Sequence, residues 1–311
     1  MFRLLSGVYL GWGLGANDAA NVFGTGVASR VVPYRTAVVL TAVFVLAGAY
    51  FEGFRGMHTI GTLTQLTMNS AFVASLAAAV TVNVLTLLAF PVSTTQAIIG
   101  AMLAAGVIAR DVNFGVLTKI LLSWILNPIG AGVISYGLYR LLGSVVEERV
   151  RDVRSWSLML RIGFYGVGIY GAYALGANNV ANTTGVYFNA GMLSARSAAV
   201  VGGLSIGLGV ITYSRRVMMT VGERITQLSE FAALIAILGQ DISVHVFAWV
   251  GVPVSASQAI VGAVIGVGFV KSSRAINFRM VWRIVVAWIC TPTAAFVLAY
   301  AMLRVWGALG A

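Results

Sequence analysis

Ten long apolar stretches, separated by short polar segments, limit what this chain can fold into more than any other feature. They cover residues 4–29, 36–54, 71–90, 92–109, 115–142, 162–190, 197–213, 231–250, 254–270 and 281–306. A transmembrane helix needs roughly 20 apolar residues, and most of these stretches approach or exceed that length. Only 9% of the residues are charged, whereas soluble globular domains carry about 25%. We therefore expect an all-α, polytopic, multi-pass protein of the cell membrane, with the lipid bilayer as its surroundings.

The basic residues predict how the chain is oriented in the membrane. The net charge of +11 would suit a nucleic-acid partner, but the Lys and Arg residues lie between the apolar stretches, so we expect no such partner. If there are ten crossings and an external N-terminus, fourteen of the twenty basic residues fall in inner loops. The positive-inside rule then predicts that both termini lie outside and that segment 143–160 is cytoplasmic.

The two halves of the chain repeat four landmarks in the same order. Residues 15–21 match 176–182, 64–66 match 226–228, 91–100 match 253–262, and Trp124 with Pro128 matches Trp288 with Pro292. The offset stays between 161 and 164 residues. Each half holds five apolar stretches, and an odd number makes the second copy enter the membrane upside down. This predicts two inverted-topology repeats, 1–142 and 161–311, joined by the charged cytoplasmic linker 143–160, a plan common in secondary transporters.

Polar motifs interrupt the first and sixth stretches, and the fourth and ninth are short. The fourth begins near Pro91 and the ninth near Pro253. Short apolar segments of this kind are often re-entrant rather than spanning. We therefore expect broken helices or re-entrant hairpins at the midplane, where such repeats place their substrate.

The first polar motif places a carboxylate at membrane depth. Asn17, Asn21 and Thr25 are spaced by four residues and share a helix face, with Asp18 beside them. A carboxylate in hydrocarbon costs several kcal/mol, so an intramembrane Asp is a functional candidate. The alternatives are that Asp18 is solvated near the interface or caps a broken helix, and that the amides only join helices. The second copy repeats the amides as Asn178, Asn179 and Asn182.

The second polar motif gathers hydroxyls at the start of a helix. Ser93, Thr94, Thr95 and Gln96 follow Pro91, and proline favours the first helical turn. Free backbone N–H groups, hydroxyl donors and the positive end of the helix dipole make such a start a ready anion site. The second copy places Ser255, Ser257 and Gln258 in the same pattern. Helix capping by Ser93 and Ser255 is the alternative, but it uses one hydroxyl per helix.

Other polar residues give weaker signals. We expect Glu52, Arg55 and His58 to be solvated at the end of the second stretch. Asp241 and His245 are spaced by four residues in an apolar run, so they would pair with each other or line a cavity. Arg215 and Arg216 are typical of an inner-face cluster that contacts lipid headgroups.

Taken together, these residues resemble the inorganic phosphate transporter (PiT) family, which also includes sulfate permeases. The matching segments are 15–25, 91–96, 215–222 and 253–258, with Ser123, Trp124 and Pro128. The resemblance implies cation-coupled symport of inorganic phosphate by alternating access, in an inverted-repeat fold that assembles as a homodimer. It assigns the substrate to Asp18, Asn21, Ser93, Thr94, Thr95, Gln96, Asn182, Ser255, Ser257 and Gln258. It assigns the coupling cation, sodium or a proton, to Asn17, Asp18, Asn178 and Asn179, and implies no other cofactor or metal.

The chain departs from the family pattern at several positions. Asn179 stands where the family usually has Asp, Gln96 and Gln258 stand where it has His, and Val45 replaces an acidic residue. Fewer carboxylates weaken the case for several bound sodium ions. The identity of the coupling ion therefore stays open, and so does the identity of the anion.

Phosphate and sulfate are distinguished by one proton. Phosphate carries a proton near pH 7 and sulfate does not, so the acceptor Asp18 favours phosphate, whereas the loss of Asp at 179 favours a proton-coupled sulfate or related oxyanion permease. A passive anion channel would need a continuous pore and weak sites, which the broken helices disfavour. An enzyme is not expected, because no nucleophile is paired with a base.

Overall fold

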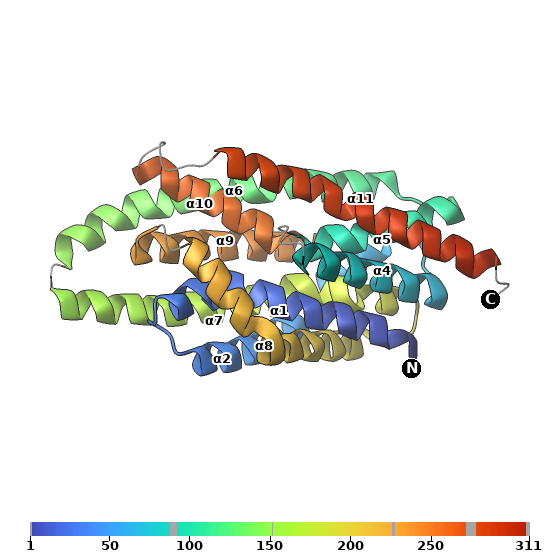
Figure 1. Cartoon of the computed structure of the whole chain (residues 1–311), viewed down its shortest axis with the longest axis horizontal. Coiled ribbons are helices and arrows are strands. Elements are labelled where there is room, and N and C mark those ends of the chain that lie inside the picture. The colour runs from blue at the N-terminus through green and yellow to red at the C-terminus, as the bar shows by residue number, and fades with distance from the viewer. Residues whose placement is uncertain (1, 88–91, 151, 226–227, 272–277, 309–311) are drawn as a thin grey trace.

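The structure is a computed structural model that describes residues 2–87, 92–150, 152–225, 228–271 and 278–308. Within them the chain forms one short 3-10 helix and eleven α-helices (Figure 1). They are η1 (Phe2–Leu4), α1 (Leu5–Ala28), α2 (Tyr34–Glu52), α3 (Phe54–Gly61), α4 (Met68–Leu87), α5 (Thr94–Ala109), α6 (Phe114–Arg149), α7 (Val153–Asn189), α8 (Ala195–Ile225), α9 (Glu230–Val250), α10 (Ala256–Lys271) and α11 (Phe278–Ala308). The all-helical fold class that the apolar stretches predict is confirmed.

Each expected apolar stretch contains a helix, and α3 is an addition that follows α2. Seven of the described helices are long and apolar enough to cross a membrane, so the chain is a multi-pass membrane protein. Helix α1 is not among them, because its glycines and the polar residues around Asp18 lower its hydropathy. Helices α5 and α10 have 16 residues each. At 1.5 Å per residue they reach about 24 Å, short of the roughly 30 Å hydrocarbon core.

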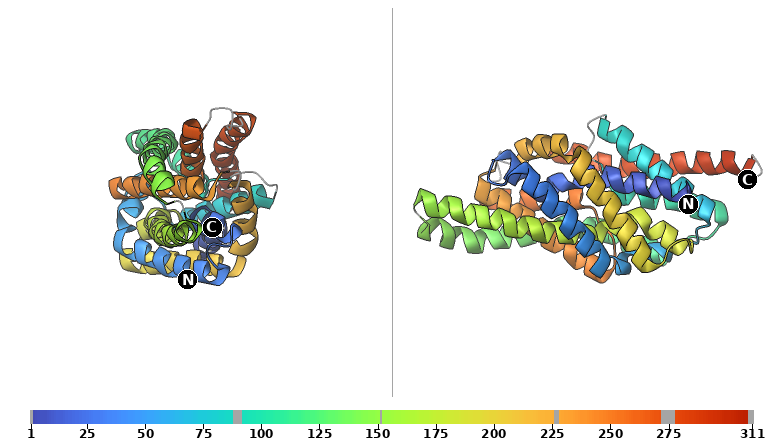
Figure 2. Two further views of the ribbon diagram at one scale, coloured as in Figure 1. Left: turned by 90° about the vertical axis from the view of Figure 1, so that its left-hand side faces the viewer. Right: turned by 90° about the horizontal axis from the view of Figure 1, so that it is seen from below.

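The helices run mostly along the long axis of the molecule. Figure 1 places both ends of the chain at one end of this axis and the connection between α6 and α7 at the other, and the right-hand view in Figure 2 agrees. An odd number of membrane crossings in each half would give this arrangement.

The segment expected as a linker, 143–160, is largely helical. Helix α6 continues to Arg149 and α7 begins at Val153, which leaves three residues between them. The Asp152 carboxylate caps α7 by accepting hydrogen bonds from the backbone N–H groups of Arg154, at 2.8 Å, and Ser155, at 3.1 Å. Hydrogen bonds from the Ser155 side chain and from these backbone groups hold the pKa of the exposed Asp152 below its ordinary value.

Helices α4 and α5 form a hairpin that returns to the end where it began. The backbone N–H of Asn113, just after α5, donates to the carbonyl of Leu63, just before α4, at 2.9 Å. The Asp111 carboxylate accepts from the Gln65 N–H at 2.7 Å. Val92 and Ser93, just before α5, are buried. The two helices therefore begin and end at the same end of the molecule, as expected of a hairpin, and Pro91 lies outside the described residues. That this hairpin is re-entrant in the membrane stays a prediction.

Helices α9 and α10 form a second hairpin that enters from the opposite end of the long axis (Figure 1). Gly251 ends α9 with a φ of +79°, a conformation that glycine adopts without strain. The turns of the two hairpins meet, because the Thr95 hydroxyl donates to the Val254 carbonyl at 3.1 Å. Residues 226–227, part of one repeated landmark, lie outside the described residues.

Glycines allow the helix backbones to touch in matched pairs. A Cβ on Gly15 of α1 would strike the carbonyl of Ile206 on α8, and one on Gly176 of α7 would strike the carbonyl of Val45 on α2. Two further sets follow the same pattern: Gly209–Trp12 with Gly48–Tyr173, and Gly100–Pro292 with Gly262–Pro128. Membrane helices commonly associate through small residues in this way. In every set, the two contacts are related by the offset that relates the repeated landmarks.

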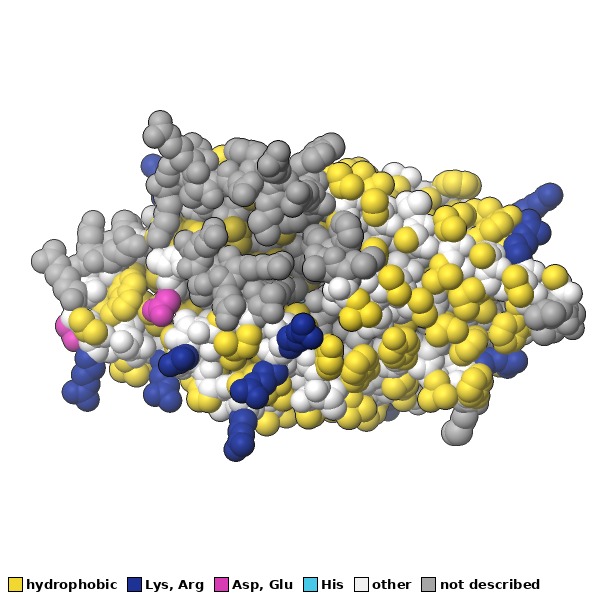
Figure 3. Space-filling view, viewed as in Figure 1, with side chains coloured by type: hydrophobic (Ala, Val, Ile, Leu, Met, Phe, Trp, Pro, Cys, Tyr) yellow, Lys and Arg dark blue, Asp and Glu magenta, His cyan; other side chains and the backbone are white. Residues whose placement is uncertain are grey.

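The outer surface is largely apolar. Figure 3 shows hydrophobic side chains spread over much of the visible face, with Lys and Arg gathered mainly toward the ends. Exposed apolar side chains include Val133 on α6, Ile162 on α7 and Ile289 on α11. Such a surface is suited to lipid rather than water.

Candidate functional site

The polar motifs converge where the two hairpin turns meet α1 and α7. Ser93 and Ser255 cap the starts of α5 and α10, and their hydroxyls accept from the N–H groups of Gln96 and Gln258 at 3.3 Å in each case. The capping role therefore accounts for these two serines. The N-terminal ends of both helices lie in the interior, because Ser93, Thr94 and Ser255 are buried.

Asn178 of α7 fixes the turn of the second hairpin. Its amide donates to the Val254 carbonyl at 2.8 Å, and its side-chain oxygen accepts from the Val254 N–H at 2.9 Å. This two-way pairing imitates the contact between two β-strands and satisfies both backbone groups of a buried residue. Asn178 therefore positions the hairpin, and its oxygen is already engaged.

Asn182, one turn further along α7, reaches the first hairpin. Its amide donates to the Thr95 hydroxyl at 2.8 Å and to the Asn179 side-chain oxygen at 2.9 Å. Thr95 donates onward to Val254. A continuous chain of hydrogen bonds thus joins α7 to both hairpin turns, and Asn182 itself is fully buried.

Asp18 of α1 contacts this chain through Asn179. The Asn179 amide donates to the Asp18 carboxylate at 3.2 Å. Asp18 is only 6% exposed and has no ion-pair partner among the described residues. A buried carboxylate without a cation is costly. The position is therefore suited to a bound cation or a proton.

Several buried polar atoms around this network have no hydrogen-bond partner among the described residues. They are Thr94 Oγ1, Gln96 Oε1, Asn182 Oδ1 and Gln258 Oε1, and all four residues were predicted from the sequence to bind substrate. Because amide oxygen and nitrogen positions are assigned rather than seen, each Gln or Asn can present a donor or an acceptor here. Buried polar groups are normally paired, so these atoms mark the place where a polar ligand can bind.

The remaining residues predicted to bind the substrate or the cation are Asn17, Asn21 and Ser257. Asn21 is buried on α1, whereas Asn17 and Ser257 are half-buried. The hydrogen-bond network among the described residues includes none of these three side chains.

Sequence reasoning missed two members of the site. The Asn127 amide of α6 donates to the Ser255 carbonyl at 2.9 Å, and the Ser243 hydroxyl of α9 donates to Asn127. Asn127 is fully buried beside Pro128. An amide within the apolar run 115–142, next to a repeated landmark, was the signal that could have revealed it.

Comparison with known proteins decides the family. The phosphate transporter family pattern matches residues 14–299. The chain belongs to this family. A relative from Thermococcus kodakarensis, named "Putative phosphate permease", is 30% identical, with 96% of each chain covered. One of the same description from Methanocaldococcus jannaschii is also 30% identical, with 97% of this chain and 96% of the relative covered.

A solved structure has the same fold. The protein titled "The sodium-dependent phosphate transporter" superposes with a TM-score of 0.85, covering 99% of this chain and 100% of that one at 24% identity. The resemblance that the motifs suggested is therefore confirmed for both family and fold.

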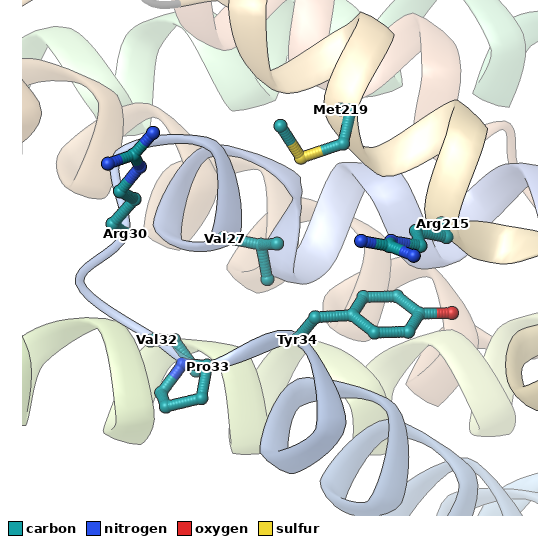
Figure 4. Close-up of a pocket in the computed structure, with 7 residues that line it drawn as sticks. All are labelled: Val27, Arg30, Val32, Pro33, Tyr34, Arg215 and Met219. Atoms are coloured by element: carbon teal, nitrogen blue, oxygen red, sulfur yellow. The ribbon is translucent and has the colours of Figure 1, made fainter.

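In this phosphate transporter family member, the Arg215 motif lies away from the hairpin turns. Arg215 and Arg30 flank a cavity of about 230 Å³, lined also by Val27, Val32, Pro33, Tyr34 and Met219 (Figure 4). The guanidinium of Arg215 stacks 5.8 Å from the centre of the Tyr34 ring. This cavity lies between α8 and the end of α1, and it shares no lining residue with the network around Asp18.

Two weaker expectations are corrected by the structure. Of the two alternatives for Asp241 and His245, the pairing is wrong, because the two ring nitrogens of His245 lie 2.9 Å from the Glu52 carboxylate and 3.0 Å from the Tyr170 hydroxyl. Asp241 is buried and accepts instead from Gln240 at 2.8 Å. Glu52 is not freely solvated, since Tyr173 also donates to it at 2.8 Å. Helices α2, α7 and α9 pack together here, and hydropathy alone could not predict that contact.

Oxygen atoms dominate what the site offers to a cation. No group of three or more His, Cys, Asp or Glu side chains lies together among the described residues. The carboxylate of Asp18 and the side-chain oxygens of the neighbouring amides are hard ligands, appropriate to an alkali cation rather than a transition metal.

Proposed function

We propose that this phosphate transporter family member carries out cation-coupled symport of inorganic phosphate across the cell membrane. The observation that carries the proposal is the meeting of two helix-start turns beside the buried Asp18–Asn179 pair. N-terminal N–H groups and hydroxyls suit an oxyanion, and the carboxylate suits a cation. The two ligands would then bind side by side in one buried place.

The anion is assigned to the helix starts and the side chains that face them. Its ligands are Ser93, Thr94, Thr95, Gln96, Ser255, Ser257 and Gln258, with Asp18, Asn21 and Asn182 completing the site. Thr94 supports this assignment most directly, because its buried hydroxyl has no partner. A hydrogen bond to a charged group contributes about 1.5–3 kcal/mol, so few such contacts suffice without a buried Arg.

Asp18 favours phosphate over sulfate. A hydrogen phosphate ion has an O–H that can donate to the carboxylate, whereas sulfate can offer only acceptors. Asn179 favours the alternative, a proton-coupled permease for sulfate or a related oxyanion, because an amide stands beside Asp18 where a second carboxylate could have stood.

The cation, sodium or a proton, is assigned to Asp18 with Asn17, Asn178 and Asn179. Asn178 and Asn179 already accept hydrogen bonds through their side-chain oxygens. Asp18 therefore supplies the charge, and the amides around it hold its position. The solved structure that shares this fold is of a sodium-dependent phosphate transporter, which supports sodium as the first choice.

Alternating access would use the two repeats as its moving parts. We assign residues 1–142 and 161–311 to inverted repeats, which the matched glycine contacts support. Hairpins entering from opposite ends and meeting midway provide a site that can open to either side. We further assign the α6–α7 connection to the cytoplasm, both termini to the outside, and the assembled protein to a homodimer.

Counterflow in proteoliposomes tests the proposal. Radiolabelled phosphate is added outside vesicles loaded with unlabelled phosphate, with and without a sodium gradient, and sulfate is the competitor. We expect saturable uptake, competition by phosphate alone and stimulation by sodium. Competition by sulfate without a sodium effect would instead establish the proton-coupled sulfate permease, and linear, non-saturating flux would establish a channel.

A further inference from the structure

A second polar cluster lies outside the anion site, at the junction of α2, α7 and α9. Glu52, the last residue of α2, accepts three hydrogen bonds through its carboxylate. The donors are Tyr173 at 2.8 Å, Trp249 at 2.9 Å and the Nε2 of His245 at 2.9 Å. The Nδ1 of His245 lies 3.0 Å from the Tyr170 hydroxyl. Every polar atom of the imidazole therefore has a partner.

The surroundings of this cluster are apolar. The Glu52 and His245 side chains are 25% and 17% exposed, while Phe51 and Val246 beside them are exposed apolar groups. Both helices are long and apolar enough to span the membrane. An ionisable pair in such a setting is costly, rare and usually functional.

The hydrogen bonds define where a proton can be added. With Glu52 ionised, Nε2 of His245 carries a hydrogen and Nδ1 accepts from Tyr170. A proton that arrives at Nδ1 requires only that the Tyr170 hydroxyl turn, so that its oxygen becomes the acceptor. The net charge of the pair then changes from minus one to zero. No helix has to move for the proton to bind.

The charged and titratable groups around His245 come from four helices. Besides Glu52 they are Tyr170 and Tyr173 on α7, Asp241 one turn earlier on α9, and Arg55 on α3. Arg55 donates to the Trp249 carbonyl at 3.1 Å rather than to Glu52. The Glu52 carboxylate, 2.9 Å from Nε2, favours a positive charge on the imidazole.

The cluster is attached to both elements that hold the anion site. Tyr173 lies five residues before Asn178 on α7, and Trp249 lies five residues before Val254, whose backbone Asn178 binds. Glu52 ties these two helices to the end of α2. A change of charge at Glu52–His245 therefore acts on the joint that positions the second hairpin turn.

We propose that Glu52 and His245 form a proton-binding site, separate from the anion site, whose occupancy controls phosphate transport. The inference rests on the proposed phosphate transport. The proton enters at Nδ1 of His245, and Glu52 balances its charge. Either ionised group would be costly if it stood alone in an apolar surface. This explains why Glu52 and His245 are paired and why both have further hydrogen-bond partners.

The test measures phosphate uptake by proteoliposomes between pH 5.5 and 8 for the wild type and His245→Gln. Glutamine can donate to Glu52 and accept from Tyr170, so it keeps the shape of the cluster but takes up no proton. The matched control is His58→Gln, because His58 is the other histidine of the chain and is exposed on α3. Protonation of phosphate itself changes equally in all variants, so the difference between curves isolates the protein.

We expect phosphate uptake by the wild type and by His58→Gln to have the same pH profile. His245→Gln should lose the part of the pH dependence that protonation of phosphate does not explain. Tyr170→Phe should shift the midpoint of the profile, because both the neutral and the protonated ring lose their partner at Nδ1, and it decides the question if His245→Gln fails to fold. An unchanged profile in both variants would overturn the proton site. Absence of wild-type uptake at every pH would overturn the proposed function instead.

Discussion

Asn182 donates a hydrogen bond of 2.8 Å to the hydroxyl of Thr95, which lies 87 positions earlier in the chain. Thr95 passes the connection on to the Val254 carbonyl. Helix α7 therefore holds the turns of both hairpins against each other at the depth of the polar motifs. An opening of the site to one side of the membrane would therefore have to break these hydrogen bonds or move α7 and the connected segments together.

Asp18→Asn should abolish phosphate uptake while leaving the protein folded. The amide keeps an oxygen that can accept from Asn179, but it removes the charge that a coupling cation needs. Uptake into proteoliposomes and the elution profile in detergent measure the two properties. Asp111→Asn is the control, because Asp111 accepts from the Gln65 N–H outside the site. Retained uptake in Asp18→Asn would remove Asp18 from the mechanism.

Thr94→Ala should weaken phosphate affinity without lowering stability. The Thr94 hydroxyl is buried and has no partner in the described part of the chain, so its removal breaks no hydrogen bond there. Losing one bond to a charged ligand costs about 1.5–3 kcal/mol, roughly a 10- to 150-fold loss of affinity. Competition uptake gives the affinity, and thermal unfolding gives the stability. Thr118→Ala, at an exposed hydroxyl that bonds its own helix, should change neither.

Thr95→Val should lower both stability and affinity. Valine has nearly the same shape, but it leaves one N–H of the Asn182 amide without its acceptor, whereas the Val254 carbonyl keeps the hydrogen bond from Asn178. Leaving a buried polar group unpaired costs about 1–3 kcal/mol. We expect a lower unfolding temperature than for Thr94→Ala in the same detergent. Equal unfolding temperatures for the two variants would mean that the hairpin connection contributes nothing.

Asn179→Asp should make uptake more dependent on a cation. The Asn179 amide now lies 3.2 Å from the Asp18 carboxylate, so the substitution brings two carboxylates together. Like charges at this distance cannot both stay ionised unless a cation lies between them. The measurement is the sodium concentration that gives half-maximal uptake in wild type and variant. A sodium response identical to wild type would separate residue 179 from the cation site.

Gly15→Ala should destabilise the fold. A Cβ there meets the Ile206 backbone carbonyl, which cannot rotate away as a side chain could. Forcing an extra methyl into a tight contact costs about 1–3 kcal/mol. Gly166→Ala is the matched control, because nothing lies within 4 Å of its new Cβ. The unfolding temperature should fall for Gly15→Ala and stay level or rise for Gly166→Ala.

The sequence predicts most of the helices. Hydropathy is a local property, so the apolar stretches predict the helical elements correctly, whereas the assignment of site residues stays a prediction. The motifs on α1, α5, α7 and α10 could be read because polar residues at membrane depth stand out against an apolar background. The sequence predicts two roles for Ser93 and Ser255, helix capping and anion binding. The structure shows the capping role.

Tertiary structure alone decided which polar groups meet. Asp18 and Asn179 come from helices far apart in the sequence, and only the packing of α1 near α7 brings their side chains together. The spacing of Asp241 and His245 suggests a pair within one helix, but α2 and α9 both pack against α7, and this places Glu52 beside the imidazole. Residue spacing fixes which face of a helix a side chain occupies. The partner on that face is set by how distant segments pack, which no local pattern encodes.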